Sequence, residues 1–336
     1  MDKFSLLDCT LRDGGYITKW DFEDCTIRGL IKGLIDANLD FIEVGYINPE
    51  VHGNNTTQFE SIEKISEYLP LERKKSMIFA MADVQVCSSD NITPCAGNSI
   101  DGIRVVFYKQ QIREAMDIAK KVKESGYKLF MQPMVTIDYT IDEYTQLSKY
   151  IAELEPYGVS IVDSFGYMLK SNFRQYFKIL DNILNVDAMI GFHSHNNLDL
   201  AFITAQDILE YDTNRRILID SSLYGMGRGA GNLNTELIAN YYNMVLEKKY
   251  NVSQILELIG KYIVPIRQEK SWGYSPYLFI TALYHYHPNF ACYLLEEYSV
   301  SVSDFERFIC TIPKEMSTKC RKPYVLEMWE KFKMRE

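Results

Sequence analysis

The 336-residue sequence lacks several patterns that would assign a protein to a class at once. None of its 7 cysteines stands in a CxxC pair, so neither a zinc knuckle nor a disulfide framework is indicated, and reduced thiols are expected. No apolar run reaches the roughly 18 residues of a membrane span. No basic and apolar leader pattern precedes the first predicted strand. We therefore expect a cytoplasmic protein without a membrane partner.

Positive charge is also scarce, because 36 Lys and Arg stand against 45 Asp and Glu, a formal net charge of -9. The basic residues are scattered rather than clustered, which argues against nucleic acid as the main partner. Small molecules are the better expectation. The hydrophobic fraction of 47% is enough for one large domain with a full core, or for a barrel with an appendage.

Eight apolar runs alternate with helical patterns over roughly the first 245 residues. The predicted strands lie at 6–11, 41–46, 76–82, 102–108, 128–137, 159–165, 189–195 and 216–223. This alternation predicts an α/β fold, either a (β/α)₈ TIM barrel or a doubly wound open sheet. Polar residues end predicted strands all along the chain, which favours the barrel, because its strand ends converge on one mouth. We predict a barrel at 1–250 and a helical, aromatic-rich C-terminal extension at 251–336.

Two polar stretches predict a metal site. The first strand would deliver Arg12 and Asp13 to a sharp glycine turn, and the seventh carries His193 and His195, whose spacing of two puts both imidazoles on one face. A carboxylate and two imidazoles leave cation positions open for a substrate that chelates through two oxygens, such as a 2-oxo acid. The alternatives are that the histidines are satisfied core residues and that Arg12 is a structural ion-pair partner.

Two further features carry less information. The glycine-rich loop within 220–232 follows the last predicted strand and can present backbone N–H groups to an anion, although such a loop is often only a tight turn. His285 and His287 also stand two apart, but on the helix predicted there they would lie ~200° apart. We do not expect them to be ligands.

Several motifs occur together and in order: DCTLRDGGY, IEVGY, DSFGYM, GFHSHNNLDLA and DSSLYGMGRGAGN. Together they resemble the metal-dependent barrel lyases and aldolases that carry an Arg-Asp-Gly motif. That family includes 4-hydroxy-2-oxovalerate aldolase, hydroxymethylglutaryl-CoA lyase and 2-isopropylmalate synthase. The likeness covers roughly residues 5 to 245 and is greatest to the aldolase, notably in GFHSHNNLDLA and GMGRGAGN.

The resemblance implies a metal-ligand set. Asp13, His193 and His195 would bind Mn²⁺ or Mg²⁺, and Asn232, which ends the glycine-rich loop, would join the metal shell as in the lyase branch.

The resemblance also implies catalytic residues. Arg12 would stabilise an enolate oxygen, and Glu43 would orient Arg12. Tyr16 stands where the aldolase has a proton-shuttling histidine, so the identity of the base is open between Tyr16 and water. The functional tyrosine that the aldolase carries in its C-terminal part would correspond to Tyr277 or Tyr274.

The function expected from these features is that of a class II pyruvate aldolase, which cleaves or forms a 4-hydroxy-2-oxo acid. Its partners would be a 2-oxo acid and an aldehyde, and the chain would form a homo-oligomer; the family's dehydrogenase partner has no support in this sequence. One alternative is an acyl-CoA lyase or Claisen-type acyltransferase on the same barrel. Another is a non-catalytic sugar-acid-binding barrel, against which the retention of Arg12, Asp13, His193 and His195 argues.

Overall fold

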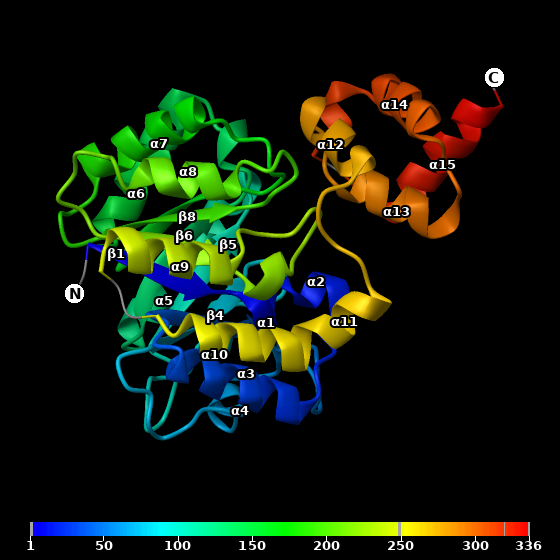
Figure 1. The fold of residues 1–336 in the computed structure, drawn as a ribbon. Coiled ribbons are helices and arrows are strands. Elements are labelled where there is room, and N and C mark those ends of the chain that lie inside the picture. Colours follow the sequence, from blue (N-terminus) through cyan, green and yellow to red (C-terminus); the bar gives the residue numbers. More distant parts are fainter. Residues whose placement is uncertain (1–2, 248–249, 319, 335–336) are drawn as a thin grey trace.

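The computed structural model describes residues 3–247, 250–318 and 320–334, and its centre is a closed parallel sheet (Figure 1). The eight barrel strands are β1 (Phe4–Asp8), β2 (Phe41–Ile47), β4 (Met77–Asp83), β5 (Gly102–Phe107), β6 (Lys128–Pro133), β7 (Gly158–Asp163), β8 (Met189–Ser194) and β9 (Ile217–Ser221). They pair in the order β1-β9-β8-β7-β6-β5-β4-β2, and β1 also pairs with β2. This last pairing closes the sheet, so the predicted TIM barrel is confirmed and the open sheet is excluded. A two-residue strand, β3 (Gln58–Phe59), pairs with β2 outside the ring.

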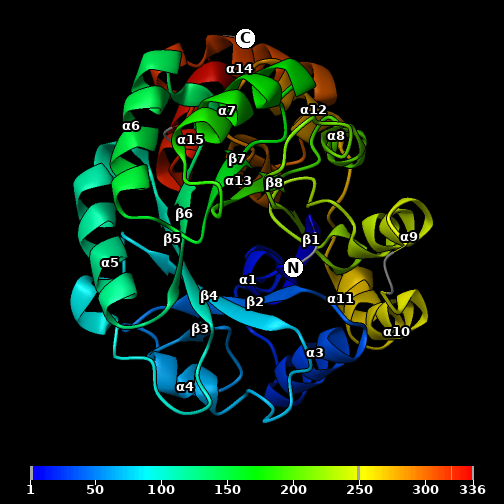
Figure 2. The same ribbon diagram turned by 90° about the vertical axis from the view of Figure 1, so that its left-hand side faces the viewer.

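Helices surround the barrel, as Figure 2 shows. They are α3 (Asp24–Asp36), α4 (Ile62–Ser66), α5 (Ile112–Glu124), α6 (Ile141–Glu153), α7 (Lys170–Ile183), α8 (Ala201–Ile208) and α9 (Thr235–Val245). In α5, Ala115, Ala119 and Val122 recur at helical spacing and are buried, while Lys120 and Lys123 face solvent. No helix among the described residues is long and apolar enough to cross a membrane.

The inside of the barrel is layered, because alternate residues of each strand point inward. The layer nearest the N-terminal ends is apolar and contains Leu7, Phe41, Phe79, Phe130, Met189 and Leu218. The next layer is polar and fully buried, with Glu43, Arg104, Gln132, Ser160 and Asp220. This polar layer lies under the mouth of the barrel, where it can support side chains that act there.

The segment after β1 differs from its prediction. Arg12 and Asp13 lie on a short helix, α1 (Thr10–Asp13), which is followed by α2 (Gly15–Thr18), so the predicted sharp glycine turn is wrong. Gly14 has a helical φ of -61°. Glycine is needed here for close packing instead, since a Cβ on Gly15 would lie 2.1 Å from the ring of Trp20.

The residues after 250 divide into two parts. First, α10 (Val252–Leu258), a π-helical turn (Ile259–Ile263) and α11 (Val264–Glu269) pack into the barrel's own core. Then α12 (Pro276–Leu283), α13 (Asn289–Glu297), α14 (Val302–Thr311) and α15 (Lys322–Lys333) enclose a second, aromatic core (Figure 1). The predicted helical extension is present, and the domain boundary at 250 stays a prediction. Along the chain the barrel core runs on to Trp272, whereas the second core consists of Ala230 and residues from Leu278 onward.

Candidate active site

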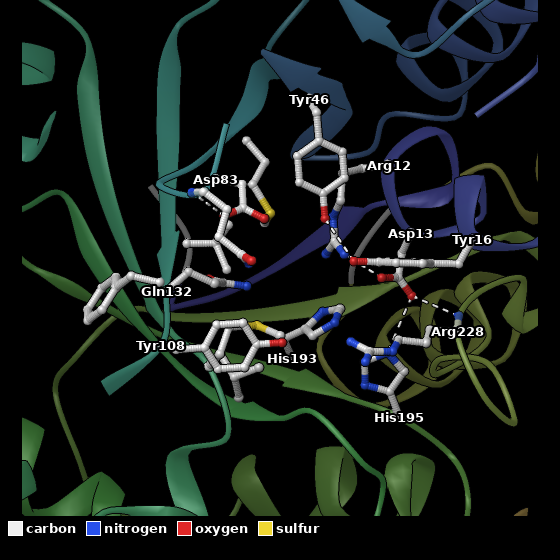
Figure 3. A pocket seen from close by; sticks show the side chains of 16 residues that line it. Arg12, Asp13, Tyr16, Tyr46, Asp83, Tyr108, Gln132, His193, His195 and Arg228 are labelled. Carbon is white, nitrogen blue, oxygen red and sulfur yellow. Dashed lines mark hydrogen bonds and ion pairs between the residues drawn. The ribbon is translucent and has the colours of Figure 1, made fainter. Parts of the chain in front are cut away.

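Three buried side chains meet at the C-terminal mouth of the barrel (Figure 3). Asp13 lies on α1, His193 lies on β8, and His195 is the first residue but one after His193, just past the end of β8. One ligand atom from each of the three residues lies within 4.8 Å of the other two. The structure thus brings together the carboxylate and the two imidazoles that the sequence singled out.

The outer nitrogens of both imidazoles are held in place. His195 Nδ1 donates to the backbone carbonyl of Asp163 at 3.0 Å, and its buried Nε2 faces Asp13 Oδ2 at 3.4 Å. His193 Nδ1 lies 3.0 Å from Asp220 Oδ2. Burial lowers the pKa of His193, which favours the neutral imidazole that a metal requires. An imidazole whose Nδ1 is anchored by a carboxylate or a backbone carbonyl is typical of histidine metal ligands.

The carboxylate of Asp13 is also fixed. Its Oδ1 contacts Arg12 Nη1, and its Oδ2 accepts from Asn232 Nδ2 at 2.6 Å and from the backbone N–H of Arg228 at 3.3 Å. Burial alone would raise the pKa of Asp13, but Arg12 and His195 outweigh it and hold the pKa well below its usual range. An ionised carboxylate and two imidazoles fit a divalent cation such as Mn²⁺ or Mg²⁺.

Asn232 faces the ligand carboxylate with its amide nitrogen. The same nitrogen lies 3.3 Å from the carbonyl of Met226, which supports this orientation of the amide. The side-chain oxygen of Asn232 is buried and has no hydrogen-bond partner among the described residues. The geometry therefore favours a positioning role for Asn232, which holds the carboxylate of Asp13. Its role as a metal ligand stays a prediction.

A chain of ion pairs runs beneath the site through the polar layer. Arg12 Nε donates to Glu43 Oε2 at 2.7 Å, and Glu43 Oε1 lies 3.3 Å from Arg104 Nη1. Arg104 Nη2 then donates to Asp220 Oδ2 at 2.5 Å, and Asp220 holds His193. Because each charge is fixed by its neighbour, both ends of the chain are held in one geometry.

Arg104 was missed by the sequence analysis. It stands alone between Ile103 and Val105 in a buried strand, and such a lone charge inside an apolar run is a signal that could have found it.

Arg12 has features of both roles considered from the sequence, the structural ion-pair partner and the site residue. It does pair with Glu43, whereas Asp8 is engaged by the backbone N–H of Thr10 and the hydroxyl of Thr235. Its Nη2, however, is buried without a partner among the described residues. Arg12 also lines the pocket, so this N–H group is available to a bound molecule.

The pocket that contains these groups is lined by sixteen side chains (Figure 3). Tyr16 is one of them, and its hydroxyl lies 3.4 Å from that of Tyr46. The side chain of Tyr16 is 39% exposed, with its hydroxyl end toward the interior of the pocket (Figure 3). Desolvation raises the pKa of Tyr16, and Arg228 offsets this only in part, so the phenol keeps its proton at neutral pH.

Tyr277 does not line this pocket. Its hydroxyl donates to the carbonyl of Val300 at 2.6 Å, and its ring packs edge-on against Phe305 in the core of the extension. This placement is contrary to the catalytic role expected for Tyr277. Tyr274 is 59% exposed and lines a neighbouring groove instead.

The glycine-rich loop contributes a residue that the sequence analysis did not single out. Arg228 lines the pocket, and its guanidinium carbon lies 5.3 Å from the centre of the Tyr16 ring. Its Nη2 contacts Nε2 of His287, which lies between α12 and α13. The C-terminal extension therefore reaches the site through His287, a histidine set aside from the sequence because it was tested only as a ligand.

A closed barrel with a buried carboxylate and two imidazoles at its mouth defines the class of a metal-dependent barrel enzyme. The model of the HMGL-like family matches residues 3–260, and the chain belongs to that family of divalent-metal-dependent aldolases and lyases. The resemblance predicted from the sequence is confirmed, and so is the expectation of a carbon–carbon lyase.

Curated relatives point the same way. The chain is 29% identical over 272 residues to a 4-hydroxy-2-oxovalerate aldolase of Geobacillus genomosp. 3, which covers 77% of this chain and 76% of that protein. It is 25% identical over 235 residues to an oxaloacetate decarboxylase of Mycobacterium tuberculosis, which covers 69% of this chain and 68% of that protein.

Solved structures share the fold. The N-terminal domain of a candidate aldolase from Bacteroides vulgatus has a TM-score of 0.75 at 23% identity, covering 92% of this chain and 97% of that one. The HMG-CoA lyase of Bacillus subtilis has a TM-score of 0.61 at 16% identity, covering 80% and 94%. Less than a tenth of this chain is left unmatched by the first structure, so that match includes part of the C-terminal helices.

Proposed function

We propose that this protein is a divalent-metal-dependent aldolase that cleaves or forms a 4-hydroxy-2-oxo acid, with pyruvate as the common product or donor. One observation carries the proposal: the Asp13–His193–His195 group shares a pocket with Arg12, whose Nη2 has no hydrogen-bond partner in the described part of the chain. Cleavage of a 2-oxo acid uses both groups. A cation binds its carboxylate and C2 oxygens, and a hydrogen-bond donor stabilises the negative charge that develops on the C2 oxygen. The relatives described as 4-hydroxy-2-oxovalerate aldolases support this assignment.

The residues divide the chemistry between them. A Mn²⁺ or Mg²⁺ ion held by the triad would supply Lewis acidity toward the two oxygens of a 2-oxo acid. Arg12 donates from Nη2 to the oxygen that becomes the enolate when the C3–C4 bond breaks. Glu43 and Asp13 already hold the other nitrogens of this guanidinium, so the donor is preorganised and needs no reorientation during the reaction.

The proton of the C4 hydroxyl needs a separate route. Tyr16 has a raised pKa and is therefore a poor base at neutral pH. Its hydroxyl orients the C4 hydroxyl and passes the proton to water. Because enolisation at C3 needs no group at C4, Tyr16 takes part in cleavage but not in exchange of the pyruvate methyl protons.

The deciding experiment follows two signals from the same protein. With Mn²⁺ in D₂O, the pyruvate methyl resonance should be lost in an enzyme-dependent way, and pyruvate plus an aldehyde should give a product with the summed mass. An acyl-CoA lyase would instead exchange the methyl protons of acetyl-CoA, and a binding protein would exchange neither. Absence of metal-dependent pyruvate exchange would contradict the proposal. The homo-oligomer and the cytoplasmic location stay predictions, and a dehydrogenase partner stays without support.

A further inference from the structure

The side chain of Arg228 is a buried cation without a carboxylate partner among the described residues. It is only 8% exposed, and its Nε has no hydrogen-bond partner there. The group that its Nη2 contacts is the imidazole of His287. Burial and the neighbouring guanidinium hold the pKa of His287 well below its usual range, so this imidazole is neutral and cannot balance the charge of Arg228.

The carboxylate that acts on Arg228 already has other partners. Asp13 acts on Arg228 electrostatically, yet its carboxylate is engaged by Arg12, Asn232 and His195. Removing a guanidinium from water without a counter-charge is costly, and a protein normally compensates a buried charge by pairing it. The unpaired cation therefore indicates that an anion from outside the protein belongs beside it.

The position of Arg228 indicates which part of a substrate it would contact. Together with Tyr16 it lines the catalytic pocket and also an adjoining groove, which Trp272, Tyr274 and Tyr293 border from the C-terminal side. Pyruvate held at the triad beside Arg12 would lie in the same pocket as Tyr16 and Arg228. A group attached at C4 that extends past Tyr16 would therefore meet Arg228.

We propose that Arg228 binds a second anionic group on the substrate, beyond C4, so that the aldehyde consumed or released is an acidic aldehyde. A carboxylate and a phosphate share the required chemistry, since either can accept charge-assisted hydrogen bonds from a guanidinium. His287 positions this arginine, which gives the C-terminal extension a part in substrate selection. The inference rests on the proposed aldolase function and narrows its substrate class.

The structure suggests one competing role for the same cation, namely binding of the carboxylate of pyruvate itself. The two roles differ in kinetics. If Arg228 binds pyruvate, its loss raises the KM for pyruvate with every aldehyde alike. If it binds the aldehyde's anion, its loss acts only on acidic aldehydes, and the ratio of kcat/KM between an acidic aldehyde and its neutral counterpart falls.

The test uses the Mn²⁺-loaded full-length protein with pyruvate and three matched aldehyde pairs. The pairs are glyoxylate with acetaldehyde, 4-oxobutanoate with pentanal, and glyceraldehyde 3-phosphate with glyceraldehyde; the first two carry a carboxylate and the third a phosphate. At least one acidic member should exceed its neutral partner in kcat/KM by about ten- to a hundredfold, the scale of a charge-assisted hydrogen bond. Arg228→Gln should erase that ratio, and Arg228→Lys should restore part of it.

A matched control removes the same charge elsewhere. Arg113 is exposed on α5, so Arg113→Gln should keep the ratio. Melting temperatures show whether each variant folds, and if Arg228→Gln does not, the wild-type preference and Arg228→Lys decide the matter. An enzyme that exchanges pyruvate protons but prefers the neutral aldehyde in all three pairs, or whose ratio survives Arg228→Gln, overturns the inference alone. Failure of pyruvate exchange in the wild type overturns the proposed function together with it.

Discussion

Replacement of Tyr16 by phenylalanine separates the two proton transfers that an aldolase requires. The change deletes one hydroxyl and keeps the ring, which packs edge-on to Trp20 at 4.8 Å and lies under Arg228. The hydroxyl's contact with Tyr46 is long, at 3.4 Å. Its loss should therefore cost folding stability no more than about 1 kcal/mol, the usual net value of one hydrogen bond.

The catalytic effect should be much larger than the stability effect. A positioned acid or base contributes about 10²-fold or more to a rate, which corresponds to about 2.7 kcal/mol of transition-state stabilisation. Tyr16→Phe should lower aldol cleavage by that factor. Exchange of the pyruvate methyl protons should continue, because it passes through the enolate beside Arg12 and involves no C4 hydroxyl.

Both rates can be measured on one preparation, by NMR in D₂O for exchange and by release of pyruvate for cleavage. Tyr150→Phe, on the exposed face of α6, controls for loss of a phenol outside the site. Normal cleavage by Tyr16→Phe would show that water or another residue handles the hydroxyl proton. Equal losses in exchange and cleavage would place Tyr16 at the enolate and refute the division of roles.

Three further outcomes test the site and its surroundings. Asp220→Asn should weaken Mn²⁺ affinity by about 10- to 100-fold because Asp220 holds His193; an unchanged affinity in calorimetry would contradict the anchoring role. Burial raises the pKa of Asp8 to about 6. Its protonated form is thus favoured in the folded state, and the stability of wild type relative to Asp8→Asn should fall by about 2 kcal/mol as pH rises from 4 to 7; denaturant titrations with no such trend would refute it. Borohydride added with pyruvate should leave the protein mass unchanged, since none of the described residues lining the pocket is a lysine; a lysine adduct in the mass spectrum would exclude the metal-dependent mechanism.

The sequence alone was sufficient for the parts of this protein that rest on local periodicity. Apolar runs alternating with helical patterns specified the strands, and a spacing of two brought together His193 on β8 and His195 just past its end. Such patterns depend only on which side chains point the same way along one element. The ordered motifs added the family, because several matches in register constrain one another.

Only the tertiary structure decided what depends on contacts between distant segments. The pairing of β1 with β2 closed the barrel, and it is this closure that lets Arg104 bridge Glu43 and Asp220 from three separate strands. A local sequence pattern does not show which residues of separate strands lie within contact distance of each other.

The C-terminal extension shows the same limit at the rim of the site. The sequence does not distinguish which of its many aromatic side chains face the barrel. In the structure Tyr277 packs in the extension's own core, whereas His287 contacts Arg228 in the pocket. The direction of each side chain was fixed by how the helical extension packs against the loops at the barrel mouth. Periodicity predicts that a helix has a buried face, whereas the partner that covers that face is chosen by the packing of the whole chain.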